Sequence, residues 1–253
     1  MHRYALAMDE PLPGTHGEAC EAALIASLLD EHERRRAARF RRPGDARRWS
    51  RVRVRLRQLL GRRCGLAPEA VRFTLGPHGK PALSPPMTPP MTPPASASDE
   101  RADPVVALPA WRFNLSHARR HAVIVLGRGA ELGVDIERID PARDTAALVG
   151  TVLDEQERRA FAALPDEACS EAFTRVWVRK EAVLKALGAG IGFGLQRVHV
   201  GIGAVPVLRI DARPAPAWRL DDLPAPAGHR AALCRGEGAG RGAGEGAGDS
   251  IPC

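Results

Sequence analysis

The segment LGVDIE at residues 132–137 alternates between apolar side chains and small or acidic ones. A period of two is typical of a β-strand, because successive side chains point to opposite faces of the sheet. The three apolar residues share one face, and Asp135 and Glu137 project from the other. Neighbouring carboxylates repel each other unless a cation or a proton lies between them. The segment therefore indicates a metal site, with Gly133 leaving room for a ligand; a solvated acidic pair is the competing interpretation.

A second stretch, WVRKEAVLK at residues 177–185, supplies a third carboxylate. In a helix, Trp177, Glu181 and Lys185 fall at i, i+4 and i+8 and share one face. An ordinary surface pair of glutamate and lysine would have the same spacing. If Glu181 faces the acidic strand, the three carboxylates offer the hard oxygen ligands that Mg²⁺ prefers.

Lysine is scarce in this protein. The 37 basic residues comprise 34 arginines and three lysines, Lys80, Lys180 and Lys185. Lysine and arginine are not interchangeable beside a crowded phosphate, because one presents a compact ammonium and the other a broad planar fork. We therefore expect a specific role for each lysine, with Lys185 reaching the same phosphates as the metal. Lys180 is offset by about 100° from Glu181 and is expected to point elsewhere.

Composition limits the class of protein. The 253 residues carry a net charge of +7, and no apolar run approaches the roughly 20 residues of a membrane span. The five cysteines are scattered and form no CxxC pair, which argues against a disulfide framework or a zinc site. We expect a cytoplasmic protein without membrane contacts. Residues 31–63 hold 14 arginines and three acidic residues, so nucleic acid, a polyphosphate cofactor or an acidic protein would each suit this stretch.

Two segments are predicted to be disordered. Residues 84–103 include the tandem repeat MTPPMTPP, and the tail at 236–253 has glycine at every second position as far as residue 248. Neither composition can bury enough apolar surface to offset the entropy of ordering. Elsewhere, periodicity and breakers predict helices at 20–42, 47–64, 154–163 and 169–187. They also predict strands at 4–8, 71–75, 121–126, 131–137, 198–202, 207–210 and 229–234, of which 121–126 and 131–137 are expected to form a hairpin.

Four motifs occur in a recognisable order: GKP at 79–81, FNLSH at 113–117, GVDIE at 133–137 and WxxKEAxxK at 177–185. Together they resemble the 4'-phosphopantetheinyl transferase superfamily, and more narrowly its surfactin-type branch of two-subdomain monomers. The resemblance runs from residue 1 to about 235. It implies an α+β fold of two similar subdomains, 1–129 and 130–235, each with a small sheet packed on a long helix. The active site is expected in the cleft between them.

The resemblance also implies an activity. The 4'-phosphopantetheinyl group of coenzyme A would pass to a serine of an apo acyl or peptidyl carrier protein, releasing 3',5'-ADP. Asp135, Glu137 and Glu181 would hold Mg²⁺, while Lys185 and His117 would contact the phosphates. The base would be Glu181 or a metal-bound water.

Further residues are implied to bind coenzyme A. One early arginine would receive the 3'-phosphate, and among Arg36, Arg41, Arg42 and Arg48 we favour Arg48. The full implied set comprises Arg48, Gly79, Lys80, Pro81, Asn114, Ser116, His117, Asp135, Glu181 and Lys185. Two other functions remain open, an arginine-rich nucleic-acid-binding protein and a non-catalytic homologue that binds coenzyme A.

Overall fold

The computed structural model describes residues 1–84 and 111–237. The segments predicted to be disordered, 84–103 and 236–253, lie outside these ranges apart from their first residues. Within the part of the chain that is described, no helix is both long enough and apolar enough to cross a membrane.

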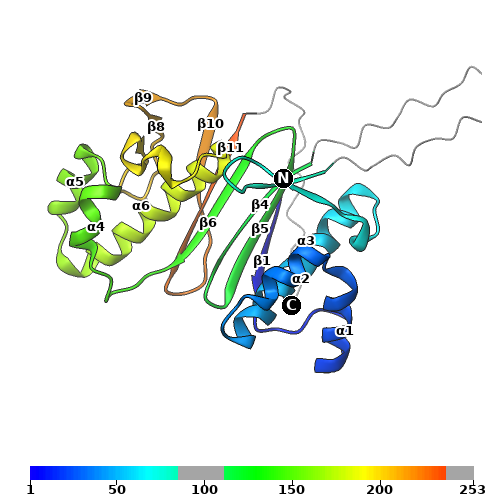
Figure 1. Cartoon of the computed structure of the whole chain (residues 1–253). Coiled ribbons are helices and arrows are strands. Elements are labelled where there is room, and N and C mark those ends of the chain that lie inside the picture. Colours follow the sequence, from blue (N-terminus) through cyan, green and yellow to red (C-terminus); the bar gives the residue numbers. More distant parts are fainter. Residues whose placement is uncertain (85–110, 238–253) are drawn as a thin grey trace, which may run out of the picture.

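Four layers make up the molecule: helix, sheet, sheet and helix (Figure 1). Helix α3 (Pro43–Cys64) packs on the sheet β1-β5-β4, and helix α6 (Asp166–Leu187) packs on the sheet β10-β11-β6. The inner faces of the two sheets meet in a shared apolar core of Val123 and Val125 against Val134. The predicted α+β architecture of two halves, each a small sheet on a long helix, is confirmed.

The first sheet consists of β1 (His2–Ala7), β5 (His121–Arg128) and β4 (Trp111–Ala118), all antiparallel. Beside it lies a short hairpin of β2 (Phe73–Leu75) and β3 (Pro81–Leu83). Gly79 in the hairpin turn has φ +78°, a conformation that glycine adopts without strain.

The helix predicted at 20–42 is wrong, because the structure divides it into α1 (Glu18–Leu28) and α2 (Glu31–Ala38). The break is a capping box. The side chain of Asp30 accepts from the Glu33 amide at 2.8 Å, and the Glu33 carboxylate accepts from the Asp30 amide at 3.2 Å. Helix α3 begins at Pro43, four residues before its predicted start, because proline suits the first position of a helix.

The predicted hairpin of 121–126 with 131–137 is also wrong. Strand β5 is the central strand of its sheet, with β1 on one edge and β4 on the other. It has no free edge for β6 (Leu132–Arg138), which pairs with β11 instead. The turn after β5 therefore joins two sheets. The proposed subdomain boundary near residue 129 coincides with it and stays a prediction.

The second half contains one helix and two strands that were not predicted, α4, β9 and β10. Helix α6 begins three residues earlier than expected and ends at Gly188, which has φ +67°. Strands β6, β10 and β11 form the main sheet, and β7, β8 and β9 form a small one. The remaining bounds are α4 (Thr145–Val152), α5 (Glu155–Ala162), β7 (Val198–His199), β8 (Arg209–Ile210), β9 (Arg213–Pro214), β10 (Trp218–Leu223) and β11 (His229–Gly236), with 3-10 turns η1 (Pro68–Ala70), η2 (Ile191–Phe193) and η3 (Leu195–Arg197).

Helix α6 lies directly against β6 at Gly133. A Cβ atom there would lie less than 3.0 Å from the Ala182 carbonyl oxygen and the Ala186 amide nitrogen, closer than side chains approach. The expectation that Gly133 leaves room for a ligand is therefore wrong, because the helix backbone fills that room. This close approach brings the polar face of α6 onto the acidic face of β6.

Strands β4 and β6 are the facing edges of the two sheets. Instead of a backbone ladder, the amide nitrogen of Val134 donates to Oδ1 of Asn114 at 3.0 Å. The buried Asn114 side chain thus joins the two halves beside the pocket described next.

Candidate active site

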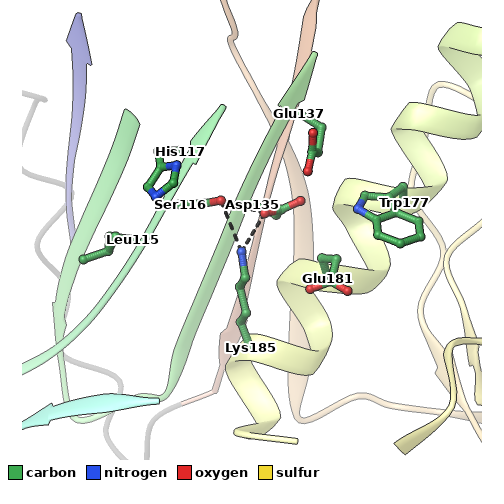
Figure 2. Close-up of a pocket in the computed structure, with 8 residues that line it drawn as sticks. All are labelled: Leu115, Ser116, His117, Asp135, Glu137, Trp177, Glu181 and Lys185. Carbon is green, nitrogen blue, oxygen red and sulfur yellow. Dashed lines mark hydrogen bonds and ion pairs between the residues drawn. The ribbon is translucent and has the colours of Figure 1, made fainter. Parts of the chain in front are cut away.

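A cavity of about 350 Å³ lies where β4, β6 and α6 meet. Figure 2 shows the acidic residues of β6 facing Glu181 and Lys185 of α6, with Ser116 and His117 of β4 on the other side. The lining residues are Leu115, Ser116, His117, Asp135, Glu137, Trp177, Glu181 and Lys185. Three segments far apart in the chain therefore supply one polar pocket.

Asp135 and Lys185 form the polar centre of this pocket. The Lys185 ammonium lies 2.6 Å from Oδ1 of Asp135 and 3.2 Å from Oγ of Ser116. The Ser116 hydroxyl donates to the same carboxylate oxygen at 2.7 Å. This network occupies Oδ1 and leaves Oδ2 of Asp135 buried, with no hydrogen-bond partner among the described residues.

Burial and neighbouring negative charges disfavour the ionised form of the other two carboxylates, Glu137 and Glu181. Burial raises the pKa of Glu137, and the neighbouring Asp135 raises it further. The pKa of Glu181 is raised by burial, with Asp135 and Glu137 adding to the shift against the opposing effect of Lys185. Oε1 of Glu181 is buried and has no partner within the described ranges. A cation among these oxygens would relieve both the repulsion and the missing contacts.

These residues fit a magnesium ion. Three carboxylates from two elements face one pocket, and two of them present a buried oxygen without a partner. Mg²⁺ is bound by hard oxygen ligands, commonly by one or two carboxylates together with substrate phosphates. The donor set therefore suits such an ion, and the metal roles of Asp135, Glu137 and Glu181 are a proposal.

His117 lies at the exposed rim of the pocket. The surrounding walls remove part of its water, which lowers its pKa, and the Lys185 ammonium lowers it further by repelling a second positive charge. A neutral imidazole at this rim can donate or accept a hydrogen bond.

Some predicted residues lie outside the cavity lining. The Lys80 ammonium is 2.6 Å from Glu131 and 3.0 Å from the Ala186 carbonyl near the end of α6. Arg48 is bound by Asp9 at 3.0 Å and by Asp45 at 2.6 Å. The other three, Gly79, Pro81 and Asn114, belong to the hairpin and to the sheet junction. Their binding roles stay predictions.

Sequence reasoning did not assign Leu115 and Trp177 as site residues, although both line the pocket. Trp177 shares a helical face with Glu181 and Lys185, so its spacing already indicated the location. Sequence reasoning also missed Glu131. Its carboxylate pairs with Lys80 and, at 2.8 Å, with Arg112.

Comparisons with known proteins give the family of this chain. The family model of the 4'-phosphopantetheinyl transferase superfamily matches residues 131–234, which include every acidic residue of the pocket. HetI, a 4'-phosphopantetheinyl transferase of Nostoc sp., is 30% identical over 220 residues, covering 86% of this chain and 80% of HetI. The chain belongs to the 4'-phosphopantetheinyl transferase superfamily. The HetI match covers both halves of this superfamily member and supports the two-subdomain branch.

Two further proteins are similar to this superfamily member over shorter spans of its chain. The slr0495 protein of Synechocystis sp. is 33% identical over 172 residues, 68% of this chain, and the chain spans 62% of its length. A holo-(acyl-carrier-protein) synthase from Bacillus anthracis is 21% identical, with a TM-score of 0.37, over 43% of this chain and 96% of that chain.

Proposed function

We propose that the protein transfers the 4'-phosphopantetheinyl group of coenzyme A to a serine of an apo acyl or peptidyl carrier protein. The observation that carries the proposal is the pocket lined by Asp135, Glu137 and Glu181 together with Lys185. Family membership supports the same activity. Because β4 of the first half and β6 and α6 of the second half together supply the pocket, we also propose that the monomer is the active unit.

Asp135, Glu137 and Glu181 would hold Mg²⁺ on the pyrophosphate of coenzyme A. When bound, the ion supplies positive charge that offsets the charge of the pyrophosphate and of the departing phosphate. Lys185 lies within hydrogen-bond distance of Asp135 and Ser116. From there its ammonium would contact a phosphate oxygen and would stabilise negative charge that develops on the leaving group.

The transfer requires one proton to move. The carrier serine Oγ forms a bond to the β-phosphorus, and the bond from that phosphorus to the bridging oxygen breaks as 3',5'-ADP leaves. Glu181 would be the favoured acceptor of the serine proton, because its carboxylate lies in the pocket with Asp135 and Lys185, where the serine would attack. His117 at the rim would contact the phosphates as a hydrogen-bonding group.

The 3'-phosphate end would lie toward the hairpin and the arginine-rich helices. The Lys80 ammonium lies 3.0 Å from the carbonyl of Ala186, the residue after Lys185, near the carboxyl end of α6. Arg48 near the start of α3 is already bound to two carboxylates, so its role as a phosphate ligand would require exchange of these partners.

The arginine-rich stretch at 31–63 supports a nucleic-acid-binding function less than the pocket supports transfer. Several of its arginines are turned to carboxylates of the same chain: Arg51 pairs with Glu21 at 2.7 Å, and Arg57 pairs with Glu33 at 2.7 Å. Both arginines are buried. The stretch therefore holds the first half together, and its charge is partly neutralised internally.

The deciding experiment incubates the protein with coenzyme A, Mg²⁺ and a panel of apo-carriers, followed by intact mass measurement. A gain of one phosphopantetheinyl group on a carrier, absent from its serine-to-alanine variant, is the expected result. Binding of coenzyme A without any mass gain on the panel would favour the non-catalytic homologue. Tight binding of DNA with a steep salt dependence, and no transfer, would favour the nucleic-acid-binding alternative.

A further inference from the structure

Glu181 follows two consecutive buried cations in α6. Arg179 and Lys180 are both 0% exposed, whereas the side chain after them faces the pocket. Burying a charge is costly unless it is fully paired. The contacts of Arg179 and Lys180 therefore show what fixes the side of this helical turn that faces away from the pocket.

The Lys180 ammonium has three acceptors for its three hydrogens. It lies 2.6 Å from Oε2 of Glu157, which is also 0% exposed, 2.7 Å from the Val152 carbonyl and 3.1 Å from the Leu195 carbonyl. An ammonium has three donors and no acceptor, so this set satisfies it. The acceptors come from α4, α5 and η3, three segments behind α6.

Glu157 extends the same connection. Its Oε1 accepts from the amides of Val200 at 2.8 Å and Gly201 at 3.3 Å. It also forms a capping box with Asp154, whose carboxylate lies 2.6 Å from Nδ1 of His199. Ligand atoms of Asp154, Glu157 and His199 lie within 4.8 Å of one another, but the Lys180 ammonium already supplies the cation there.

Arg179 fixes the same loop from the adjacent position. Its guanidinium binds both oxygens of Asp222, at 2.8 and 2.6 Å, and the carbonyls of Gly201 at 2.7 Å and Gly203 at 3.0 Å. Two neighbouring residues thus tie one turn of α6 to the segment from Leu195 to Gly203. That turn has little freedom to rotate.

The first half repeats this arrangement without a catalytic carboxylate. There Asp30 and Glu33 form the capping box, and Glu33 pairs at 2.7 Å with Arg57 of α3, which is 0% exposed and binds the Val71 carbonyl at 2.7 Å. The separation from the capping glutamate to the buried cation is 24 residues there, 57 minus 33, and 23 residues in the second half, 180 minus 157. The residue after Arg57 is Gln58, whereas the residue after Lys180 is Glu181.

We infer that Lys180 is a positioning residue, whose ion pair with Glu157 holds α6 at the rotation that turns Glu181 toward Asp135. Adjacent helical residues are about 100° apart, so anchoring Lys180 behind the helix directs Glu181 into the pocket. Replacing a buried ion pair by neutral residues often leaves stability unchanged, which makes positioning the better account of its presence. The inference rests on the proposed function, in which Glu181 is a metal ligand and the base.

The test compares two matched double variants of the full chain. Lys180→Met with Glu157→Gln removes the ion pair behind Glu181, and glutamine keeps an oxygen for the Val200 and Gly201 amides. Arg57→Met with Glu33→Gln removes the corresponding buried pair in the first half, together with the ion pairs to Asp30 and Arg53. Lys180→Arg keeps the charge but presents a broader head to three closely spaced acceptors. Each is measured for thermal unfolding, for Mn²⁺ affinity by calorimetry, and for kcat and KM in transfer to an apo-carrier.

The Lys180/Glu157 double variant should fold, bind Mn²⁺ at least about 10-fold more weakly and lose about 100-fold in kcat, with KM for coenzyme A changed much less. Lys180→Arg should also bind Mn²⁺ more weakly and have a lower kcat than the wild type. The Arg57/Glu33 control should stay within about 3-fold of wild type in both, even at an equal loss of thermal stability.

Wild-type kcat and Mn²⁺ affinity in the folded Lys180/Glu157 variant would overturn the inference. Equal losses in the Arg57/Glu33 control would also overturn it, because they would reflect general destabilisation. A wild-type protein that binds Mn²⁺ but transfers nothing would refute the proposed function alone, and the Mn²⁺ affinities would still decide the positioning role. If the wild type bound no Mn²⁺, both proposals would fall.

Discussion

Gly133 of β6 and Ala182 of α6 meet backbone to backbone. A Cβ atom on Gly133 would lie less than 3.0 Å from the Ala182 carbonyl oxygen. Two residues further along the strand, Asp135 is bound by Lys185, three residues further along the helix. The strand and helix backbones therefore meet just before the point where their charged side chains meet.

Gly133→Ala should destabilise the protein by about 3 kcal/mol, because the added methyl group has to push helix backbone rather than a flexible side chain. Gly150→Ala in α4 is the matched control, since nothing lies within 4 Å of its added Cβ. We expect the control to be neutral or to gain up to about 1 kcal/mol from helix propensity. Chemical denaturation gives both values, and equal stabilities for the two variants would contradict the close contact.

Asp135→Asn should reduce transfer by about 100-fold or more while leaving the fold intact. The amide keeps the shape of the carboxylate and an acceptor for Ser116 and Lys185, but it removes the charge that a metal needs. Intact mass measurement of the carrier over time provides the rate, and circular dichroism checks the fold. Asp140→Asn, a change outside the pocket lining, serves as the control. A near wild-type rate for Asp135→Asn at low Mg²⁺ would remove this residue from the metal site.

The stabilising effect of Mg²⁺ should increase with pH. The pKa of Glu181 in the folded, metal-free protein is raised above 4.5, mainly by burial, so the folded state holds this proton more tightly than the unfolded chain. The metal-free fold therefore loses stability as pH rises from about 4.5 through the raised pKa. The pKa of Glu137 is shifted in the same direction.

Mg²⁺ binds the deprotonated carboxylates, so its increment in Tm should be small near about pH 5 and larger near about pH 7.5. Differential scanning fluorimetry at several Mg²⁺ concentrations measures it. In Glu181→Gln the increment should be smaller and should vary less with pH. An increment that is independent of pH in the wild type would contradict the assignment.

The lysines should differ in their reaction with an amine-acylating reagent. The side chains of Lys185 and Lys80 are 31% and 19% exposed, and that of Lys180 is 0% exposed. We expect Lys185 and Lys80 to be modified in the free protein and Lys180 only after unfolding. Saturation with coenzyme A and Mg²⁺ should protect Lys185, and protection of Lys80 together with it would support its place at the cofactor. Peptide mapping by mass spectrometry distinguishes these outcomes.

The pocket was largely predictable because its residues lie in regular elements. Alternation in β6 placed Asp135 and Glu137 on one face, and helical spacing placed Glu181 and Lys185 on another; the structure brings the two faces together. The expectation that Lys180 points away from Glu181 is also confirmed.

Features that depend on packing were not predictable in the same way. Gly133 suggested an open space, but only the docked helix shows that the space is filled. Turn residues after β5 suggested a hairpin, whereas sheet order depends on which strands already occupy the edges of β5. The split between α1 and α2 is different, because Asp30 and Glu33 carry the capping-box spacing in the sequence itself.

The contact of Asn114 with Val134 also bears on aggregation of the protein. An unpaired strand edge is a template for pairing with other chains. Here one edge strand of each sheet, β4 and β6, lies against the other, and the Asn114 side chain takes the place of a backbone partner for Val134. Each half therefore covers one unpaired strand edge of the other, so expressing residues 130–237 alone would expose the edge of β6 and favour self-association. For this fold, keeping the two halves in one polypeptide therefore also limits aggregation through β4 and β6.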